Sequence, residues 1–306
     1  MNLIDVTAEF NTDDKCLDYL EALRWPTGVC CIACGSVKVS RITRESKTKN
    51  KRKRLYQCLE PQCKHQFSLT AGTIFHDSHL PLRKWFAAIA LVCEAKKGLS
   101  ACQMQRHLKV NYRTAWHLCH RIREAMKEPR FMFSGKNPVE VDETYLGGHL
   151  DKRRKNPGLK VPVVGLVERG GKVQALKIPA ASSPVLIGVI KRRVPPGSRV
   201  MTDQWNAYTT LKRDFQHDVI NHIKEFGRGD IHTNTIENFW SLLNRGIVGS
   251  FHKVSIKHLD RYLAEFTYRF NRRDQQEQLF AETTKNLLNG KVLTYQKLTD
   301  SGISGS

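Results

Sequence analysis

Three acidic residues stand close together in an otherwise basic chain, within the β-branched segment 139–144. Side chains alternate across a strand, so Glu140 and Asp142 share one face, and Glu143 lies on the other face with the valines. Carboxylates gathered on a strand favour a hard cation such as Mg²⁺, which binds one or two of them and keeps water or phosphate oxygens as its other ligands. A solvent-exposed edge strand fits this segment equally well. A metal site therefore requires further acids from elsewhere in the chain.

Four of the nine cysteines are spaced for metal binding. Cys31 and Cys34 are separated by two residues and followed by a glycine, and Cys58 and Cys63 form a second pair. Two such pairs can complete a tetrahedral Zn²⁺ site, so the sequence predicts a zinc ribbon with one structural zinc.

Three alternatives remain open for these cysteines. Four residues, not the usual two, separate Cys58 from Cys63, so His65 can take the place of Cys63. Cys30 can likewise compete with Cys31. Finally, free cysteines often pack as small buried hydrophobic side chains.

The charge balance indicates a polyanionic partner. The 306 residues include 50 Lys and Arg against 29 Asp and Glu, a net charge of +21 with pI near 9.7. Nucleic acid is the favoured partner for such an excess. The chain has no apolar run of 18 residues and no secretory signal, so we expect no membrane association and a protein that works inside the cell.

A basic run lies between the two cysteine pairs, at the expected tip of the ribbon hairpin. It ends with Lys51, Arg52, Lys53 and Arg54. Such a run either contacts phosphates or is simply solvated. Because the whole chain is basic, contact with DNA phosphates is one of the two interpretations that stay open.

Helical spacing follows the ribbon. A largely buried helix is expected over 82–95, a second over 100–107, and a third over 112–126 after a short link. The last two have the spacing of a helix-turn-helix, whose exposed recognition end would present Asn111, Tyr112 and Arg113 to DNA bases. Lys109, Arg121 and Arg123 add positive charge around it. A plain helical linker bundle is the alternative.

Strand patterns begin after Pro138. Three antiparallel strands are expected over 139–144, 161–168 and 172–178, then a helix over 184–192 and a strand over 199–202 that delivers Asp203. A short helix over 206–211, a strand over 217–221 and a helix over 235–245 complete the order. The last helix places Glu237, Ser241 and Asn244 on one face.

This arrangement resembles the DDE transposases of bacterial insertion sequences, specifically the ISXO-like class that carries a zinc ribbon. The resemblance spans nearly the whole chain, from the Cys31 knuckle to the segment YRFNRR at 268–273. Its most specific segments are VEVDETYLGG at 139–148, TDQW at 202–205 and HTNTIENFWSLL at 232–243.

The resemblance implies a ribonuclease-H-like catalytic domain whose acids are Asp142, Asp203 and Glu237. Two Mg²⁺ ions per active site, with Mn²⁺ as an alternative, would serve phosphoryl transfer on DNA. The activity implied is cleavage at element ends and strand transfer into target DNA, by a homo-oligomer acting on the bacterial nucleoid in the cytoplasm. A catalytically silent DNA-binding descendant of such an enzyme is the alternative function.

Two departures from the family pattern concern the last helix. Family members often carry Lys where this chain has Asn244, and neighbouring Arg245 can supply the missing charge to DNA. Some members use Asn as the third ligand, which keeps Asn234 and Asn238 as rivals of Glu237.

The expected fold class is a multidomain α+β chain with four parts. A leading helix and zinc ribbon occupy 1–72, and a helical domain with the helix-turn-helix occupies 73–133. The mixed-sheet, ribonuclease-H-like domain occupies 134–275, and a C-terminal tail occupies 276–306.

Overall fold

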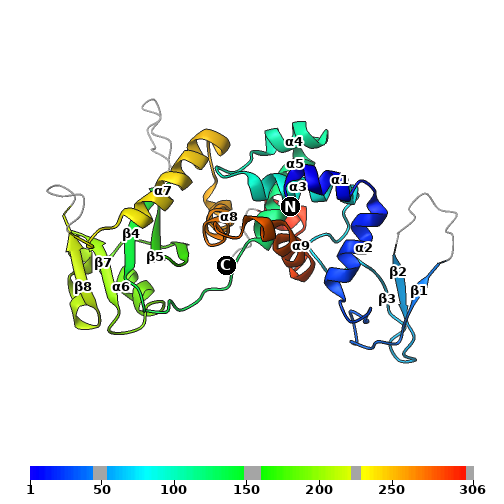
Figure 1. Ribbon diagram of the computed structural model, residues 1–306, viewed down its shortest axis with the longest axis horizontal. Helices are drawn as coiled ribbons and strands as arrows, with labels where there is room; N and C mark the ends of the chain where they lie inside the picture. The colour runs from blue at the N-terminus through cyan, green and yellow to red at the C-terminus, as the bar shows by residue number, and fades with distance from the viewer. Residues whose placement is uncertain (44–53, 148–159, 222–228, 301–306) are drawn as a thin grey trace. The chain divides into compact units, whose positions relative to one another are not determined.

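The computed structural model describes residues 1–43, 54–147, 160–221 and 229–300, and its chain separates into two compact units (Figure 1). Unit 1 comprises Met1–Ala95, Ala101–Met126 and the chain from Gln275 onward. Unit 2 comprises Lys96–Ser100 and Lys127–Asp274. The ribbon, the helical segment and the C-terminal residues, which the sequence analysis assigns to three separate parts, thus share one compact unit.

Unit 1 combines a small sheet with several helices. The sheet is antiparallel, in the order β1-β2-β3, and consists of β1 (Val39–Ile42), β2 (Leu55–Cys58) and β3 (Gln66–Ser68). The α-helices are α1 (Leu3–Glu9), α2 (Asp13–Arg24), α3 (Leu82–Glu94), α4 (Ala101–Leu108), α5 (Tyr112–Ala125), α9 (Leu279–Asn289) and α10 (Tyr295–Thr299), with the 3₁₀-helix η4 (Gln276–Gln278). The predicted helices over 82–95, 100–107 and 112–126 are therefore confirmed as secondary structure, whereas α1 was not expected.

Aromatic side chains hold unit 1 together across long distances in the sequence. The Phe10 ring lies 4.8 Å from Phe86 of α3 and 6.0 Å from Phe280 of α9, measured between ring centroids. The Trp25 ring, which follows α2, lies 5.5 Å from Tyr56 of β2. Because α9 contributes a fully buried ring, the residues expected to form a tail instead complete this core.

Unit 2 is built on a five-stranded mixed sheet in the order β6-β5-β4-β7-β8. β4 (Val139–Leu146), β5 (Val161–Glu168) and β6 (Val173–Lys177) run antiparallel, and β7 (Arg199–Asp203) and β8 (Gln216–Ile220) continue the sheet in parallel with β4. Its helical elements are α6 (Ser183–Lys191), η1 (Asn206–Arg213), α7 (Asn234–Gly246), η2 (Ile247–Phe251), η3 (Ile256–His258) and α8 (Leu259–Phe270). The order of strands and helices along the chain that the sequence predicts is confirmed, as is the α+β class with a mixed sheet.

Alternation along the strands divides the unit 2 core into two layers. Val164 and Leu166 of β5 belong to the core covered by α6 and η1. Val163 and Val167 of the same strand belong to the core covered by α7 and α8. Both faces of the sheet are therefore covered at β5, which is why that strand is a nearly continuous apolar run.

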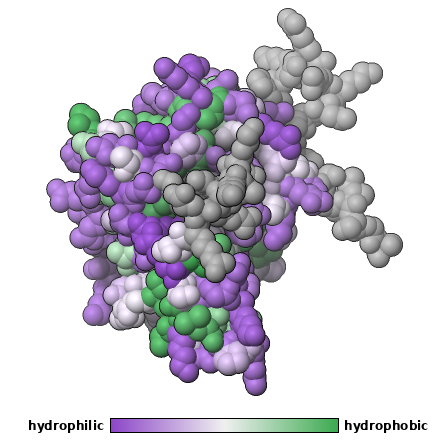
Figure 2. Space-filling view, turned by 90° about the vertical axis from the view of Figure 1, so that its right-hand side faces the viewer, coloured by the Kyte–Doolittle hydropathy of each residue, from purple (hydrophilic) through white to green (hydrophobic). Residues whose placement is uncertain are grey.

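Figure 2 shows the face of the molecule on the ribbon side of unit 1, which is largely hydrophilic with hydrophobic residues gathered toward its lower end. The ribbon exposes the apolar side chains of Ile32, Val37 and Leu59. No helix in the described segments is long and apolar enough to cross a membrane.

Close packing of α7 on the sheet depends on a glycine in β5. A Cβ at Gly165 would lie 2.5 Å from the Trp240 ring and 2.7 Å from the Ile236 side chain, closer than real contacts allow. We expect Gly165→Ala to lower the free energy of unfolding of unit 2 by about 1 to 3 kcal/mol, because α7 must move outward. Urea unfolding of the full chain measures this.

Gly249→Ala is the matched control, since its Cβ would meet nothing within 4 Å in the described structure. An equal effect of the two substitutions would contradict the close-packing explanation.

Candidate active site and zinc site

Three carboxylates converge at the end of the unit 2 sheet. Asp142 and Glu143 lie on β4, Asp203 ends β7, and one oxygen of each lies within 4.8 Å of the others. Asp142 and Asp203 are two of the acids that the resemblance implies. Glu143 joins them although the sequence analysis did not select it as a ligand.

Strand pairing explains how acids from both faces meet. β4 pairs with β5 along its whole length, but in the described residues it pairs with β7 only at Val139 and Glu140. Beyond that point the two parallel strands separate, which opens their edge. Glu143 lies on the η1 face, as alternation predicts, and accepts a hydrogen bond from the Tyr208 hydroxyl. Tyr208 is buried and holds this carboxylate toward the opening.

The electrostatics of this cluster favour a cation. Burial, together with the negative charges of Glu143, Asp203 and Glu237, raises the pKa of the Asp142 carboxyl to about 7. Burial and Asp203 likewise raise the pKa of Glu143, although the Tyr208 hydrogen bond opposes this. A divalent cation among these oxygens would reverse the effect, because it stabilises the ionised carboxylates.

Glu237 approaches this cluster from α7. Its side chain is exposed in the first turn of the helix and accepts a hydrogen bond of 2.7 Å from the Thr233 hydroxyl. It is close enough to raise the pKa of Asp142, but it is not among the three carboxylates that lie within 4.8 Å of one another. Asn234 and Asn238 are exposed on the same helix.

Glu140 has a positioning role that the sequence did not reveal. Its fully buried carboxylate accepts hydrogen bonds from the backbone N–H groups of Thr235 (2.8 Å) and Ile236 (3.1 Å), in the first turn of α7. It also pairs with the Arg169 guanidinium at 2.7 Å, and the His232 ring lies 3.4 Å away. From the sequence alone Glu140 is a candidate metal ligand beside Asp142, but these contacts occupy its oxygens and tie α7 to β4.

We expect Glu140→Gln to lower the free energy of unfolding by roughly 3 kcal/mol, because it breaks a buried ion pair and places an amide N–H₂ against N–H donors. Hydrogen exchange should show loss of protection at the Thr235 and Ile236 amides. Asp260→Asn serves as the control, since its pair with Lys177 (3.5 Å) is largely exposed and worth less than about 1 kcal/mol. Unchanged exchange at the start of α7 would contradict the anchoring role.

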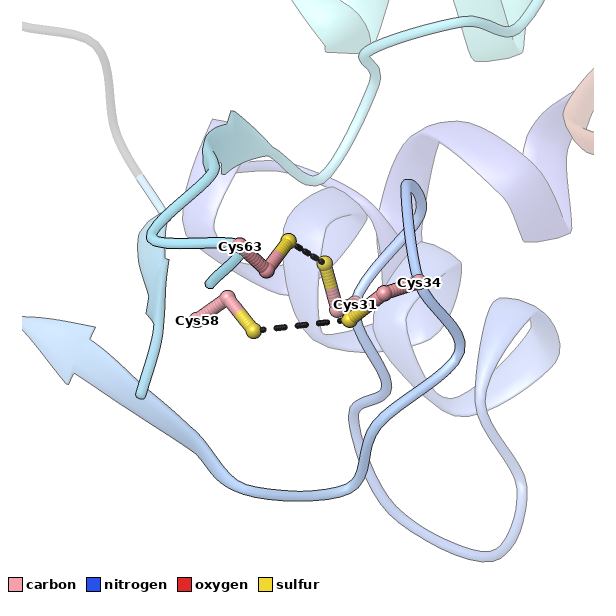
Figure 3. Close-up of side chains that lie close together, drawn as sticks. All are labelled: Cys31, Cys34, Cys58 and Cys63. Atoms are coloured by element: carbon pink, nitrogen blue, oxygen red, sulfur yellow. Dashed lines mark hydrogen bonds between the residues drawn. The ribbon is translucent and has the colours of Figure 1, made fainter. Parts of the chain in front are cut away.

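The second site lies in the ribbon, where the four predicted cysteines converge (Figure 3). The Sγ atoms of Cys31 and Cys63 are 3.7 Å apart, and those of Cys34 and Cys58 are 3.6 Å apart. With Zn–S bonds of about 2.3 Å, a tetrahedral site has S···S edges of about 3.8 Å. The thiols therefore already have the spacing of a zinc tetrahedron, and the residues fit the metal.

A tight turn between Cys31 and Gly35 contributes to this arrangement. After Cys34, the left-handed φ of +77° at Gly35 lets its N–H donate to the Cys31 carbonyl at 2.9 Å. Burial opposes ionisation of the Cys31 thiol, but the N–H groups of Cys34 and Ala33 outweigh it and lower the pKa to about 7. Cys30 and His65 are not in the cluster, and the His65 ring stacks on Phe67 instead.

The residues predicted to read DNA lie at the start of α5. Asn111 caps this helix by accepting a hydrogen bond of 2.7 Å from the Thr114 N–H, and Tyr112 and Arg113 are exposed. The Arg113 guanidinium lies 4.0 Å from the Tyr295 ring centroid of α10. Stacking holds the guanidinium plane and leaves its edge donors directed outward.

Other expected basic contacts differ from the prediction. Arg121 and Arg123 are buried, so they do not form a basic surface around α5. Arg121 donates to the carbonyls of Ile74 and His76, and burial lowers its pKa to about 10. A helical position alone does not show whether a long cationic side chain turns inward to cap a neighbouring loop.

The remaining DNA candidates have mixed placements. Arg54 forms ion pairs with Asp18 and with Glu21 (2.6 Å) of α2. These pairs neutralise its charge within unit 1. Lys51, Arg52 and Lys53 lie outside the described residues. On α7, Asn244 and Arg245 are both exposed, and Arg245 Nε donates to the Ser241 carbonyl at 3.2 Å.

Comparisons with known proteins match the segments of the chain that contain these two sites. The ISXO2-like transposase domain matches residues 132–271, and the transposase zinc-ribbon domain matches residues 11–66. A protein of Halobacterium salinarum, named as an uncharacterized protein in transposable element ISH50, is 29% identical over 281 residues, covering 85% of this chain and 91% of the relative. An uncharacterized transposase-like protein of Haemophilus influenzae is 31% identical over 123 residues, covering 40% of this chain and 98% of the relative.

These matches define the class of protein as a transposase with an N-terminal zinc-ribbon domain. The chain belongs to the ISXO2-like transposase family, and the resemblance recognised in the sequence is confirmed.

Proposed function

We propose that this chain is an active transposase that binds insertion-sequence ends, cleaves DNA beside them and joins them to a target. The observation that carries the proposal is the convergence of Asp142 and Asp203 from neighbouring parallel strands, with a pKa of about 7 for Asp142 that calls for a compensating cation. The sheet, with three antiparallel strands followed by two parallel ones, also supports a ribonuclease-H-like fold for unit 2.

In this proposal Asp142, Asp203 and Glu237 hold two Mg²⁺ ions, or Mn²⁺ in their place. The ions would activate the attacking oxygen and stabilise the leaving oxygen of an in-line phosphoryl displacement. Glu140 binds the start of α7 and would thereby keep Glu237 near Asp142. Glu143, held by the Tyr208 hydroxyl, adds negative charge that tightens metal binding.

DNA recognition is assigned to unit 1. The α4–α5 pair, joined by a three-residue link, would act as a helix-turn-helix with Asn111, Tyr112 and Arg113 at the bases. Lys51, Arg52 and Lys53 would contact phosphates, whereas the ion pairs of Arg54 argue for a structural role. Arg245, beside Asn244, would contact DNA near Glu237. Two ends joined in one reaction imply a homo-oligomer.

Substituting each acid by its neutral amide should affect Mg²⁺-dependent cleavage and DNA binding differently. We expect Asp142→Asn, Asp203→Asn and Glu237→Gln each to lose Mg²⁺-dependent cleavage by orders of magnitude, because each removes a ligand charge. DNA binding in a gel shift should persist or tighten, because less negative charge faces the phosphates. The measurement uses the full chain with labelled element ends, with and without Mg²⁺.

Glu143→Gln identifies the third ligand. The amide keeps a carbonyl acceptor for Tyr208, so we expect it to retain much more cleavage than Glu237→Gln. The opposite ranking would replace Glu237 by Glu143, and undiminished cleavage by Asp142→Asn would refute the metal mechanism. If the unaltered chain binds ends but never cleaves them, it is a silent DNA-binding protein.

The four ribbon thiols should bind one structural zinc per chain. Because so small a module draws much of its folding free energy from the metal, strong chelation should unfold the ribbon and leave the unit 2 sheet intact. Metal analysis and hydrogen exchange on the full chain measure the two effects. Cys34→Ser should lower the zinc content, whereas Cys30→Ser, outside the cluster, should leave it unchanged. Zinc-free protein purified without chelator would contradict this site.

A further inference from the structure

Unit 2 contains a basic cavity that the acidic site does not use. It has a volume of about 410 Å³ and lies between the end of β6 and the helix α6. Arg130, Lys177, Arg192 and Arg193 line it, the other lining residues are apolar, and none of the described lining residues is acidic. None of its lining residues belongs to the carboxylate cluster.

Arg193 marks this cavity as a built site. The side chain is 5% exposed, and its only side-chain hydrogen bond in the described structure is from Nη1 to the Val189 carbonyl at 3.1 Å. Its Nε is buried without a hydrogen-bond partner among the described residues. A buried cationic donor without a partner is costly, so a ligand that accepts a hydrogen bond and carries negative charge would stabilise it.

The surrounding charges strengthen this conclusion. Burial lowers the pKa of the Arg193 guanidinium, and the like charges of Arg130 and Arg192 lower it further. Arg130 and Arg192 are exposed, and neither forms an ion pair with an acid in the described segments. Arg192 caps the C-terminal end of α6 and Arg193 follows it, where the helix dipole stabilises cations without neutralising them. The three guanidinium groups therefore remain available to an anion.

We propose that this cavity binds a phosphodiester of the DNA backbone, a contact separate from the carboxylate site. Guanidinium groups match the paired oxygens of a phosphate, and they hold phosphate more specifically than a point charge does. The apolar wall, which includes Pro179, Pro184 and Val185, can pack against the neighbouring deoxyribose. The net charge of +21 and the transposase family favour DNA over an acidic protein segment as the occupant. This assignment rests on the proposed action on DNA.

The test compares two double variants of the full chain that remove the same charge. Arg130→Ala/Arg192→Ala removes the two exposed guanidinium groups that line the cavity and keeps the buried Arg193. The fold should therefore survive, and thermal unfolding checks this. Lys212→Ala/Arg213→Ala is the control, because these residues are exposed on η1 of the same unit and do not line the cavity. Fluorescence anisotropy with a short labelled duplex, over a salt series, gives the affinity and its salt dependence.

We expect the cavity variant to bind DNA at least about five-fold more weakly at low salt, and its log–log salt slope to fall by about 0.9 for each lost phosphate contact. The control should change affinity less than about two-fold. Equal losses in the two variants would show only a general charge effect and would overturn the proposal, as would no loss in either.

Arginine footprinting gives a readout without substitution. In the unaltered chain, bound duplex should protect Arg130 and Arg192 from phenylglyoxal, as measured by mass spectrometry of their peptides. Full modification in the presence of saturating duplex would overturn the assignment. Failure of the unaltered chain to bind DNA at all would instead refute the proposed function, and this proposal with it. The two failures are therefore distinguishable.

Discussion

The buried carboxylate of Glu140 is the interaction on which the geometry of unit 2 depends. A charge with no solvent exposure persists only when it is fully paired, and here the first turn of α7 and Arg169 provide that pairing. The consequence is mechanical. α7 cannot slide or rotate on the sheet without leaving a buried charge unpaired. Asp142 follows Glu140 by two residues on β4, so Glu237 of α7 keeps its position relative to Asp142. Gly165 completes the arrangement by letting the helix approach closely.

The acids of the candidate active site show the opposite design. Asp142, Glu143 and Asp203 lie close together, and burial and their mutual repulsion raise the pKa values of Asp142 and Glu143. The Arg169 guanidinium donates to Glu140 and to the backbone carbonyls of Asp230 and His232, so its charge serves the anchoring of α7. A divalent cation bound by the carboxylate cluster would stabilise the ionised forms of Asp142 and Glu143.

Local patterns in the sequence predicted most of the helices and strands of unit 2, the four cysteines that cluster, and two of the three carboxylates that converge. Alternation placed Asp142 and Glu143 on opposite faces, and the structure agrees. It could not show that β7 leaves β4 after Glu140, so that both carboxylates reach one opening. The roles of Glu140 and Arg121 were missed because their partners lie 95 and 47 residues away in the sequence. For the same reason α9, which completes the core of unit 1, was expected to be a tail.

In the proposed function, the two faces of the unit 2 sheet have different roles. α7, on one face, begins on a carboxylate and carries the third acid of the proposed triad. α6, on the other face, ends with Arg192 and Arg193, which its dipole stabilises without neutralising. Acids that gather metal ions repel the DNA on which they act, so binding energy must come from cations placed elsewhere. Because α6 and α7 pack on opposite faces of one sheet, the proposed phosphate contacts and the proposed metal ligands are held apart, so the cations do not neutralise the acids.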